Sequence, residues 1–317
     1  MTQAEFVERT ERYRRELLAH CYRMLGSVDD AEDLVQETYL RAWRGFAAFE
    51  ERSSVRTWLY RIATNACLNA LAHSERRVLP SGLVGPSDDP TRPDPEALEA
   101  PWLQPFPDRL LGDDPATVAV AREGIRLAFV AALQHLPARQ RAVLILRDVL
   151  GWRAAEVAAL MDTTTASVNS ALQRARAQLD EVAPARDEVV PPTEPASLAL
   201  LDRYAAAFAN ADLDDLLATL RDDVVLEMPP RPMWVQGLAV CRRFMASRVT
   251  MPGALRLIPT AANGQPAFAT YFRADGFYHA HNVQVLTVTP TGIAHVVAFI
   301  DAGLFPAFGL PLVEPVA

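Results

Sequence analysis

The stretch at residues 154–179 constrains this chain most, because its pattern predicts two short helices joined by a tight turn. In the second helix the apolar residues recur at i, i+4, i+7 and i+11, namely Val168, Leu172, Ala175 and Leu179. This is the stripe of a helix that lies on a small core, and the hydroxyl of Thr164 is placed to cap its start. The pattern indicates a helix-turn-helix with a polar, Arg-bearing second helix. An ordinary helical hairpin with a solvated face is the alternative at this point.

The formal net charge of −8 argues against a nucleic-acid binder only until it is divided by segment. Residues 122–183 carry 8 basic and 6 acidic side chains, whereas residues 80–121 carry 2 and 8. Every basic residue is Arg. A surplus of two cations is too small for tight DNA binding through phosphates alone. Any DNA binding by this segment therefore needs a partner that contributes most of the contacts.

Other function classes are made improbable by the rest of the composition. The sequence has no run of about 18 uncharged apolar residues and its first residues are charged, so we expect a cytoplasmic protein that does not enter a membrane. The three cysteines, Cys21, Cys67 and Cys241, lie far apart without metal-ligand spacing. We expect no disulfide framework, no metal site and no cofactor.

The N-terminal region predicts a compact all-α domain, because residues 6–74 contain no proline. The periodicity favours helices over residues 5–25, 31–46 and 55–73. Near the start of the third helix, four residues lie outside the apolar stripe. They are two aromatic residues, an arginine and an asparagine: Trp58, Tyr60, Arg61 and Asn65. Such a set can stack on unpaired bases and bond to them. A Trp and a Tyr in a helix are, however, more often core residues.

Two proline-rich segments divide the rest of the chain. Residues 80–121 hold nine of the 24 prolines and are acidic, so we expect a self-repelling, extended linker, although its apolar part at 101–111 is expected to dock on something. A second cluster spans residues 183–197. Beyond it, helices are expected at 198–210, 213–220 and 238–249, with strands at 224–228 and between 254 and 301. This order predicts an α+β cone with a curved antiparallel sheet.

Three segments taken together resemble the extracytoplasmic-function (ECF) group of bacterial RNA polymerase sigma factors: DAEDLVQETYLRAWRGF at 30–46, RTWLYRIATNACLNAL at 56–71, and residues 136–179. The resemblance implies binding to core RNA polymerase through the helix with Asp33, Gln36, Glu37 and Arg41. It implies recognition of the promoter −10 strand by Trp58, Tyr60, Arg61 and Asn65. The implied readers of the −35 element are Ser167, Asn169, Ser170, Gln173, Arg174 and Arg176. Asn169 and Ala171 are uncharged where the family often has basic residues.

The last part of the chain resembles the SnoaL-like group of the ketosteroid-isomerase superfamily, whose cone encloses a small-molecule cavity. Residues that could line such a cavity are Asp223, Glu227, His279, His281, His295 and Asp301. Strand alternation puts His279 and His281 on one face of their strand, and His295 and Asp301 on one face of the next. Polar lining or surface positions are favoured over catalysis, so no residue is assigned as catalytic.

Together these features predict a multidomain protein with two all-α sigma domains at 1–79 and 122–183, the second a helix-turn-helix, and a SnoaL-like domain at 198–317. Linkers at 80–121 and 184–197 separate them. The function expected is promoter-specific transcription initiation, with the cone as a regulator and not as an enzyme. The alternative is a small-molecule isomerase or cyclase that carries the helical domains for targeting DNA. A small ligand in the cone and an anti-sigma protein are further candidate partners.

Overall fold

The computed structural model describes residues 3–49, 53–72, 74–89, 95–112, 124–182, 190 and 194–316. The chain folds into two compact units, each of which is built from two separate stretches of sequence. Met1–Arg77 and Leu110–Pro184 form the helical unit, whereas Val78–Arg109 and Ala185–Ala317 form the sheet-containing unit. The segment expected to be a free linker between the helical domains is thus divided between the two units. Most of the second expected linker, at 184–197, lies outside the described residues.

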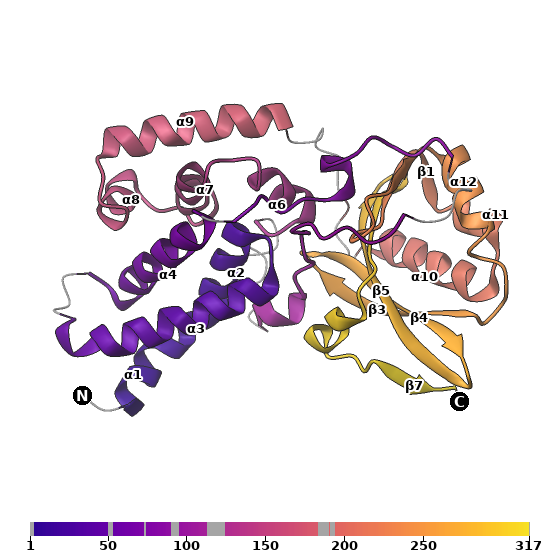
Figure 1. Ribbon diagram of the computed structural model, residues 1–317, viewed down its shortest axis with the longest axis horizontal. Helices are drawn as coiled ribbons and strands as arrows, with labels where there is room; N and C mark the ends of the chain where they lie inside the picture. Colours follow the sequence, from indigo (N-terminus) through magenta and orange to yellow (C-terminus); the bar gives the residue numbers. More distant parts are fainter. Residues whose placement is uncertain are drawn as a thin grey trace. The chain divides into compact units, whose positions relative to one another are not determined.

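The first part of the helical unit contains α1 (Gln3–Thr10), α2 (Arg14–Leu25), α3 (Val28–Gly45) and α4 (Val55–Leu71) (Figure 1). The single helix expected over residues 5–25 is wrong, because the short turn η1 (Glu11–Tyr13) interrupts it. Gly26 ends α2 in the left-handed conformation, and Ser27 caps α3 by accepting a hydrogen bond from Asp30 N. Leu17, Val35 and Leu59 are among the side chains that form the buried core of this part.

The second part contains α6 (Leu127–Leu133), α7 (Ala138–Leu144), the wide turn η5 (Ile145–Val149), α8 (Ala154–Leu160) and α9 (Thr165–Val182). The expected helix-turn-helix is confirmed as α8 and α9. Thr164 accepts the backbone N–H of Ser167 at 3.1 Å, as expected of the cap. Val168, Leu172 and Ala175 are buried, so the apolar stripe of α9 faces the core as its spacing predicts.

The second unit is built on a seven-stranded sheet in the order β2-β1-β6-β5-β4-β3, with β7 paired to β5. Its strands are β1 (Leu220–Glu227), β2 (Trp234–Gln236), β3 (Leu255–Ala262), β4 (Gln265–Ala274), β5 (Phe277–Thr289), β6 (Gly292–Phe299) and β7 (Val313–Pro315). Three helices accompany it: α10 (Pro195–Asn210), α11 (Leu213–Leu217) and α12 (Leu238–Ala246). A buried core that includes Tyr204, Phe244 and Leu286 joins these helices to the sheet. The expected α+β cone is confirmed, with an open sheet.

Two irregularities in strand pairing overturn the expected faces of β5 and β6. The register of β4 and β5 shifts between Thr270 and Tyr271, so that Asn282 and Ala280 are their partners and His281 is skipped. The register of β5 and β6 shifts in the same way at Ala294. Because an extra residue reverses the alternation beyond it, Ile293 belongs to the helix-covered core whereas His295 does not. Strict period-two counting cannot detect such bulges.

The acidic segment before α6 is held on the sheet-containing unit by several hydrogen bonds. Its short turn η3 (Pro80–Gly82) places Ser81 N 2.8 Å from Glu227 Oε2. Further along, Phe106 N donates to Asn263 Oδ1 at 2.8 Å, and Asn263 N donates back to Phe106 O at 2.8 Å. Phe106 is fully buried. The apolar part of the segment therefore docks, as expected, and its docking site lies within the second unit.

No helix in the described part of the chain is long and apolar enough to cross a membrane. The described residues also contain no group of three or more His, Cys, Asp or Glu side chains that could hold a metal ion.

Candidate nucleic-acid interface

The polar side of α9 is open to solvent along its length. All six side chains expected to read DNA are exposed: Ser167, Asn169, Ser170, Gln173, Arg174 and Arg176. They lie on α9 because the apolar stripe fixes which side of the helix packs on the domain, and every position off that stripe then points away. The amide and guanidinium groups among them are the side chains that bond to base edges in the major groove. This arrangement suits a recognition helix.

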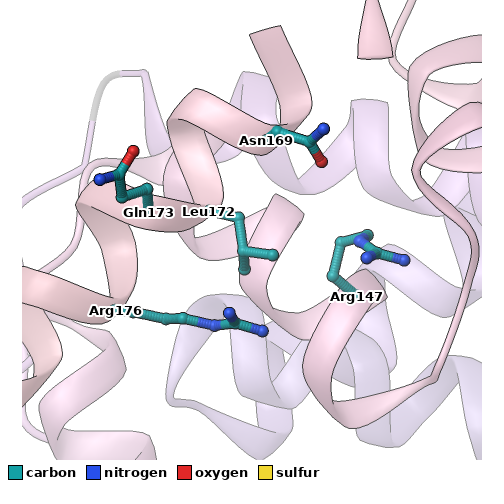
Figure 2. A pocket seen from close by; sticks show the side chains of 5 residues that line it. All are labelled: Arg147, Asn169, Leu172, Gln173 and Arg176. Atoms are coloured by element: carbon teal, nitrogen blue, oxygen red, sulfur yellow. The ribbon is translucent and has the colours of Figure 1, made fainter. Parts of the chain in front are cut away.

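A groove of about 330 Å³ lies beside α9 and is lined by Arg147, Asn169, Leu172, Gln173 and Arg176 (Figure 2). Arg176 reaches from α9 toward the segment that carries Arg147, with Leu172 between them. Two guanidinium groups and two amides around one groove can bind the oxygens of a phosphate. Sequence reasoning missed Arg147, because it lies before the helix-turn-helix on the wide turn η5, which helical periodicity does not predict.

The guanidinium group of Arg176 is held by an acidic residue on η5, the turn that also carries Arg147. Arg176 makes two hydrogen bonds to Asp148, with Nε 2.8 Å from Oδ2 and Nη2 2.7 Å from Oδ1. The hydrogen bonds to Asp148 raise the pKa of Arg176. Both side chains remain accessible, at 57% for Arg176 and 31% for Asp148. A phosphate approaching the groove would therefore compete with Asp148 for the guanidinium group.

On α4 the structure separates the four residues expected at the −10 strand. Arg61 and Asn65 are exposed, in agreement with their expected outward position. Trp58 and Tyr60 are buried, at 8% and 0% exposure, and the expectation that they face outward is corrected. Trp58 stacks on Phe49 at a centroid distance of 4.8 Å, and Tyr60 packs against His20. Both rings have partners that lie outside α4, which the pattern of one helix does not reveal.

The outer side of α3 carries the residues expected to bind the polymerase. Glu37 and Arg41 form an i,i+4 ion pair at 2.6 Å, and Asp33 and Gln36 are exposed on the same helix. Between them lies an apolar side chain that sequence reasoning missed, Leu40, which is 58% exposed. Its position on the polar side of the helix is the signal that could have identified it. A large apolar group surrounded by polar ones is typical of a protein-binding surface.

The six residues expected to line a cavity in the cone make several different contacts. Asp223 lies at the surface in an ion pair with Arg221 at 2.6 Å. His279 and His281 both contact Phe272, at centroid distances of 5.4 and 5.8 Å. Asp301 caps the short helix η6 (Ala302–Phe308) by accepting the N–H of Gly303. None of these contacts joins the four residues to the remaining pair, and the shared cavity stays a prediction.

The remaining pair, Glu227 and His295, forms a buried contact away from the helix-covered core. Their Oε1 and Nε2 atoms are 2.9 Å apart, and the Glu227 side chain is only 2% exposed. Burial would raise the pKa of Glu227, but the hydrogen bonds from His295 and Ser81 hold it below its usual value. The second oxygen of Glu227 accepts the N–H of Ser81. Glu227 thus contacts both His295 and the docked segment.

Comparison with known proteins gives one consistent result. Family models match at residues 10–77 (Sigma-70 region 2), 126–179 (Sigma-70, region 4) and 201–305 (SnoaL-like domain). The ECF RNA polymerase sigma factor SigG of Mycobacterium tuberculosis is 52% identical over 313 residues, which cover 97% of this chain and 84% of that protein. SigJ of the same organism is 30% identical over 219 residues, covering 69% and 63%. The crystal structure of SigJ matches with a TM-score of 0.63 at 25% identity, over 96% of this chain and 99% of that one.

Proposed function

Because this chain belongs to the ECF family of RNA polymerase sigma factors, we propose that it reads a promoter at two places, with α9 at the −35 element and the exposed side of α4 at the −10 element. As a sigma factor it directs promoter-specific transcription initiation by core RNA polymerase. The observation that carries the assignment of α9 is its exposed polar side beside the groove with Arg147 and Arg176.

Within this proposal the residues of α9 divide into two roles. Arg174 and Gln173 read base edges, because both are exposed and both carry donors that match the major-groove pattern. Arg147 and Arg176 hold a backbone phosphate at the groove, which fixes the register of α9 on the duplex without reading sequence. On α4, Arg61 and Asn65 contact the unpaired −10 strand in the conformation described.

The test is a DNA-binding and transcription assay with core polymerase and a mapped promoter. We expect Arg174→Ala to weaken −35 binding by about 1–3 kcal/mol and to relax sequence preference, whereas Arg147→Ala should weaken binding to all sequences alike. The matched control is Arg203→Ala, which removes an exposed, ion-paired Arg from the cone. If Arg174→Ala binds and transcribes like the control, α9 is not the recognition helix.

We assign polymerase binding to the outer side of α3. Leu40 supplies the apolar centre, and Asp33, Gln36 and the Glu37–Arg41 pair supply the polar rim. Reversing the charges at Glu37 and Arg41 together should lower affinity for core polymerase while the helical content stays unchanged, because both side chains are exposed. Unchanged affinity in the folded double variant would contradict this assignment.

The SnoaL-like domain is assigned a regulatory role in this proposal. The support is that the segment connecting the two sigma regions is held on it through Ser81, Phe106 and their partners Glu227 and Asn263. Release of that segment would change the freedom of both helical domains, and a small ligand of the cone or an anti-sigma protein could shift that balance. Transcription by the full chain compared with the Glu227→Gln variant tests the role. Equal output, although the connecting segment has become more susceptible to proteolysis, would contradict it.

We do not propose the isomerase or cyclase alternative. Its one described acid and imidazole contact, Glu227 with His295, is also bonded to Ser81 of the docked segment, and the relatives that match most of the chain are named as sigma factors. We also place the protein in the cytoplasm, where its polymerase partner works.

A further inference from the structure

The turn between β3 and β4 carries the only Asn–Gly pair in the sequence, Asn263 and Gly264. Because β3 ends at Ala262 and β4 begins at Gln265, these two residues alone form the connection. Both have left-handed backbones, with φ of +57° and +68°. Asn–Gly is the preferred sequence for such a two-residue hairpin turn, since both residues tolerate positive φ. The turn geometry therefore accounts for the two residue types.

The same two residues can react with one another. The backbone nitrogen of Gly264 attacks the side-chain carbonyl carbon of Asn263, so that a bond forms from this nitrogen to Cγ. The Cγ–Nδ2 bond breaks, and ammonia leaves with the proton of the Gly264 N–H. Water then opens the resulting succinimide at either of its two carbonyl groups, which leaves aspartate or isoaspartate. Glycine favours the ring closure, because it has no Cβ to hinder the approach.

The docked segment of the second unit holds both reacting groups. Phe106 N donates to Asn263 Oδ1 at 2.8 Å, and Asn263 N donates back to Phe106 O at 2.8 Å. Asp108 Oδ1 accepts the N–H of Gly264, also at 2.8 Å. The amide that would be attacked is thus held by Phe106, and the attacking nitrogen is directed to another acceptor. Asn263 and Phe106 are both fully buried, so water is excluded as well.

The products of this reaction do not suit the docked arrangement. An aspartate at position 263 would place a negative charge at a site that is 0% exposed. The carboxylate of Asp108, which bonds to the next residue, Gly264, would add a like charge nearby. Both effects disfavour the charged group in the docked state. An isoaspartate adds a methylene group to the main chain and so displaces Gly264 N from Asp108.

We propose that Asn263 is a deamidation site which the docked segment keeps unreactive, and which changes into an acidic product once that segment is released. The product opposes renewed docking, so the modification makes release one-way. Its effect on transcription rests on the proposed regulatory role of the cone. The chemistry itself needs only the chain and water.

The first test follows deamidation of the full chain by mass spectrometry of the peptide that contains residue 263. We expect the reaction to be at least about tenfold slower in the folded chain than in urea, because it requires local opening. Asp108→Ala frees the Gly264 N–H and should raise the rate in the folded chain about fivefold, the factor for one lost hydrogen bond. Asp108→Asn keeps an oxygen acceptor and is the matched control, with a rate near that of the parent.

Two outcomes of this test would overturn the proposal. Equal rates in the folded and unfolded chains would show that the docked segment gives no protection. A rate in Asp108→Ala no higher than in the parent would show that the bond to Gly264 does not restrain the reaction. Isoaspartate among the products identifies the succinimide route.

The second test asks whether the product opposes docking, and it uses the variant Asn263→Asp. Trypsin cleavage after Arg109 reports release, because the guanidinium of Arg109 donates to Pro306 O and Ala307 O in the docked state. We expect cleavage at least about threefold faster than in the parent, since the buried charge weakens docking. Asn210→Asp adds the same charge at an exposed position of the cone and should leave cleavage unchanged.

Equal cleavage of Asn263→Asp and the parent would overturn the one-way release. Neither test involves polymerase or DNA, so each decides the modification even if the proposed function fails. Transcription by Asn263→Asp that equals that of Asn210→Asp, with both tests positive, would count against the regulatory role of the cone alone.

Discussion

The two helices assigned to DNA, α9 and α4, differ in what covers the residues off their apolar stripes. On α9 all six polar candidates are exposed, whereas on α4 Trp58 and Tyr60 are buried and only Arg61 and Asn65 remain accessible. The polar residues of α9 gain nothing from burial and stay in water. The aromatic rings of α4 gain from any apolar partner, and Phe49 and Trp152 supply one to each. A position outside the apolar stripe of a helix therefore predicts exposure for polar side chains but not for large aromatic ones.

The largest test of this comparison sets a buried Arg of the helical unit, on α7, against an exposed Arg of α9. Arg141 is 4% exposed and donates to Met24 O, Gln134 and Leu136 O. Arg141→Ala should lower the free energy of unfolding by about 3–5 kcal/mol, because several buried acceptors lose their donor. The same change at Arg174 should cost less than about 0.5 kcal/mol. Urea unfolding followed by circular dichroism measures both, and similar losses would erase the distinction between the two surfaces.

The next test uses pH. A buried histidine, His20, contacts α4, whereas α9 contains no histidine. Burial, and secondarily Arg23, lower the pKa of His20 to about 3, and its Nε2 lies 3.0 Å from Thr64 Oγ1. The folded pKa is below the unfolded value of about 6.5, so the unfolded chain takes up the proton first. This stability is fully present above pH 6.5 and is lost as the pH falls toward 3, and the loss has reached about 2 kcal/mol at pH 5.

The variant His20→Gln isolates this contribution, because its amide can bond to Thr64 but does not titrate near neutral pH. The change in unfolding free energy of the helical unit between about pH 7.5 and about pH 5 should shrink by about 2 kcal/mol relative to the parent chain. An unchanged pH dependence would show that His20 is not the group that senses acid.

The sequence predicts those features of this fold that arise within a single element. The helix-turn-helix, the cap at Thr164 and the exposed side of α9 follow from local spacing, and they are confirmed. Features set by a second element are missed. The burial of Tyr60 depends on Trp152, which lies 92 residues later in the chain, and the bulge at His281 depends on pairing with β4. Neither leaves a periodic signal in the segment where it acts.

The candidate sites divide in the same way. Arg174 and Gln173 were identified because they belong to the recognition helix itself, whereas Arg147 and Leu40 were not, because neither belongs to the polar pattern of its own helix. Strand alternation does not hold through His281, because the bulge in β5 falls on that residue. A buried acid such as Glu227 finds its partners, His295 and Ser81, only through the tertiary fold.

The smallest expected effect concerns the acidic neighbour on the α9 side of the comparison, Asp148. The variant Asp148→Asn removes a carboxylate that lies 2.7 Å from Arg176 but keeps a side chain of the same size. Because both partners are accessible, the stability of the fold should change by less than about 1 kcal/mol. DNA binding should strengthen about threefold at low salt, since one repulsive charge roughly 6 Å from a phosphate is worth about 0.7 kcal/mol in water. The gain should diminish as salt screens the charges.

The matched control is Asp215→Asn, which breaks a similar exposed pair with Arg203 in the cone and should leave DNA affinity unchanged. Fluorescence anisotropy with a −35 duplex at several salt concentrations measures both variants. Weaker binding by Asp148→Asn would mean that Asp148 orients Arg176 for its phosphate and does not compete with it. The DNA-binding side of α9 would then also rely on a residue from another element, as the rings of α4 do. The two helices would differ less than the exposure of their side chains indicates.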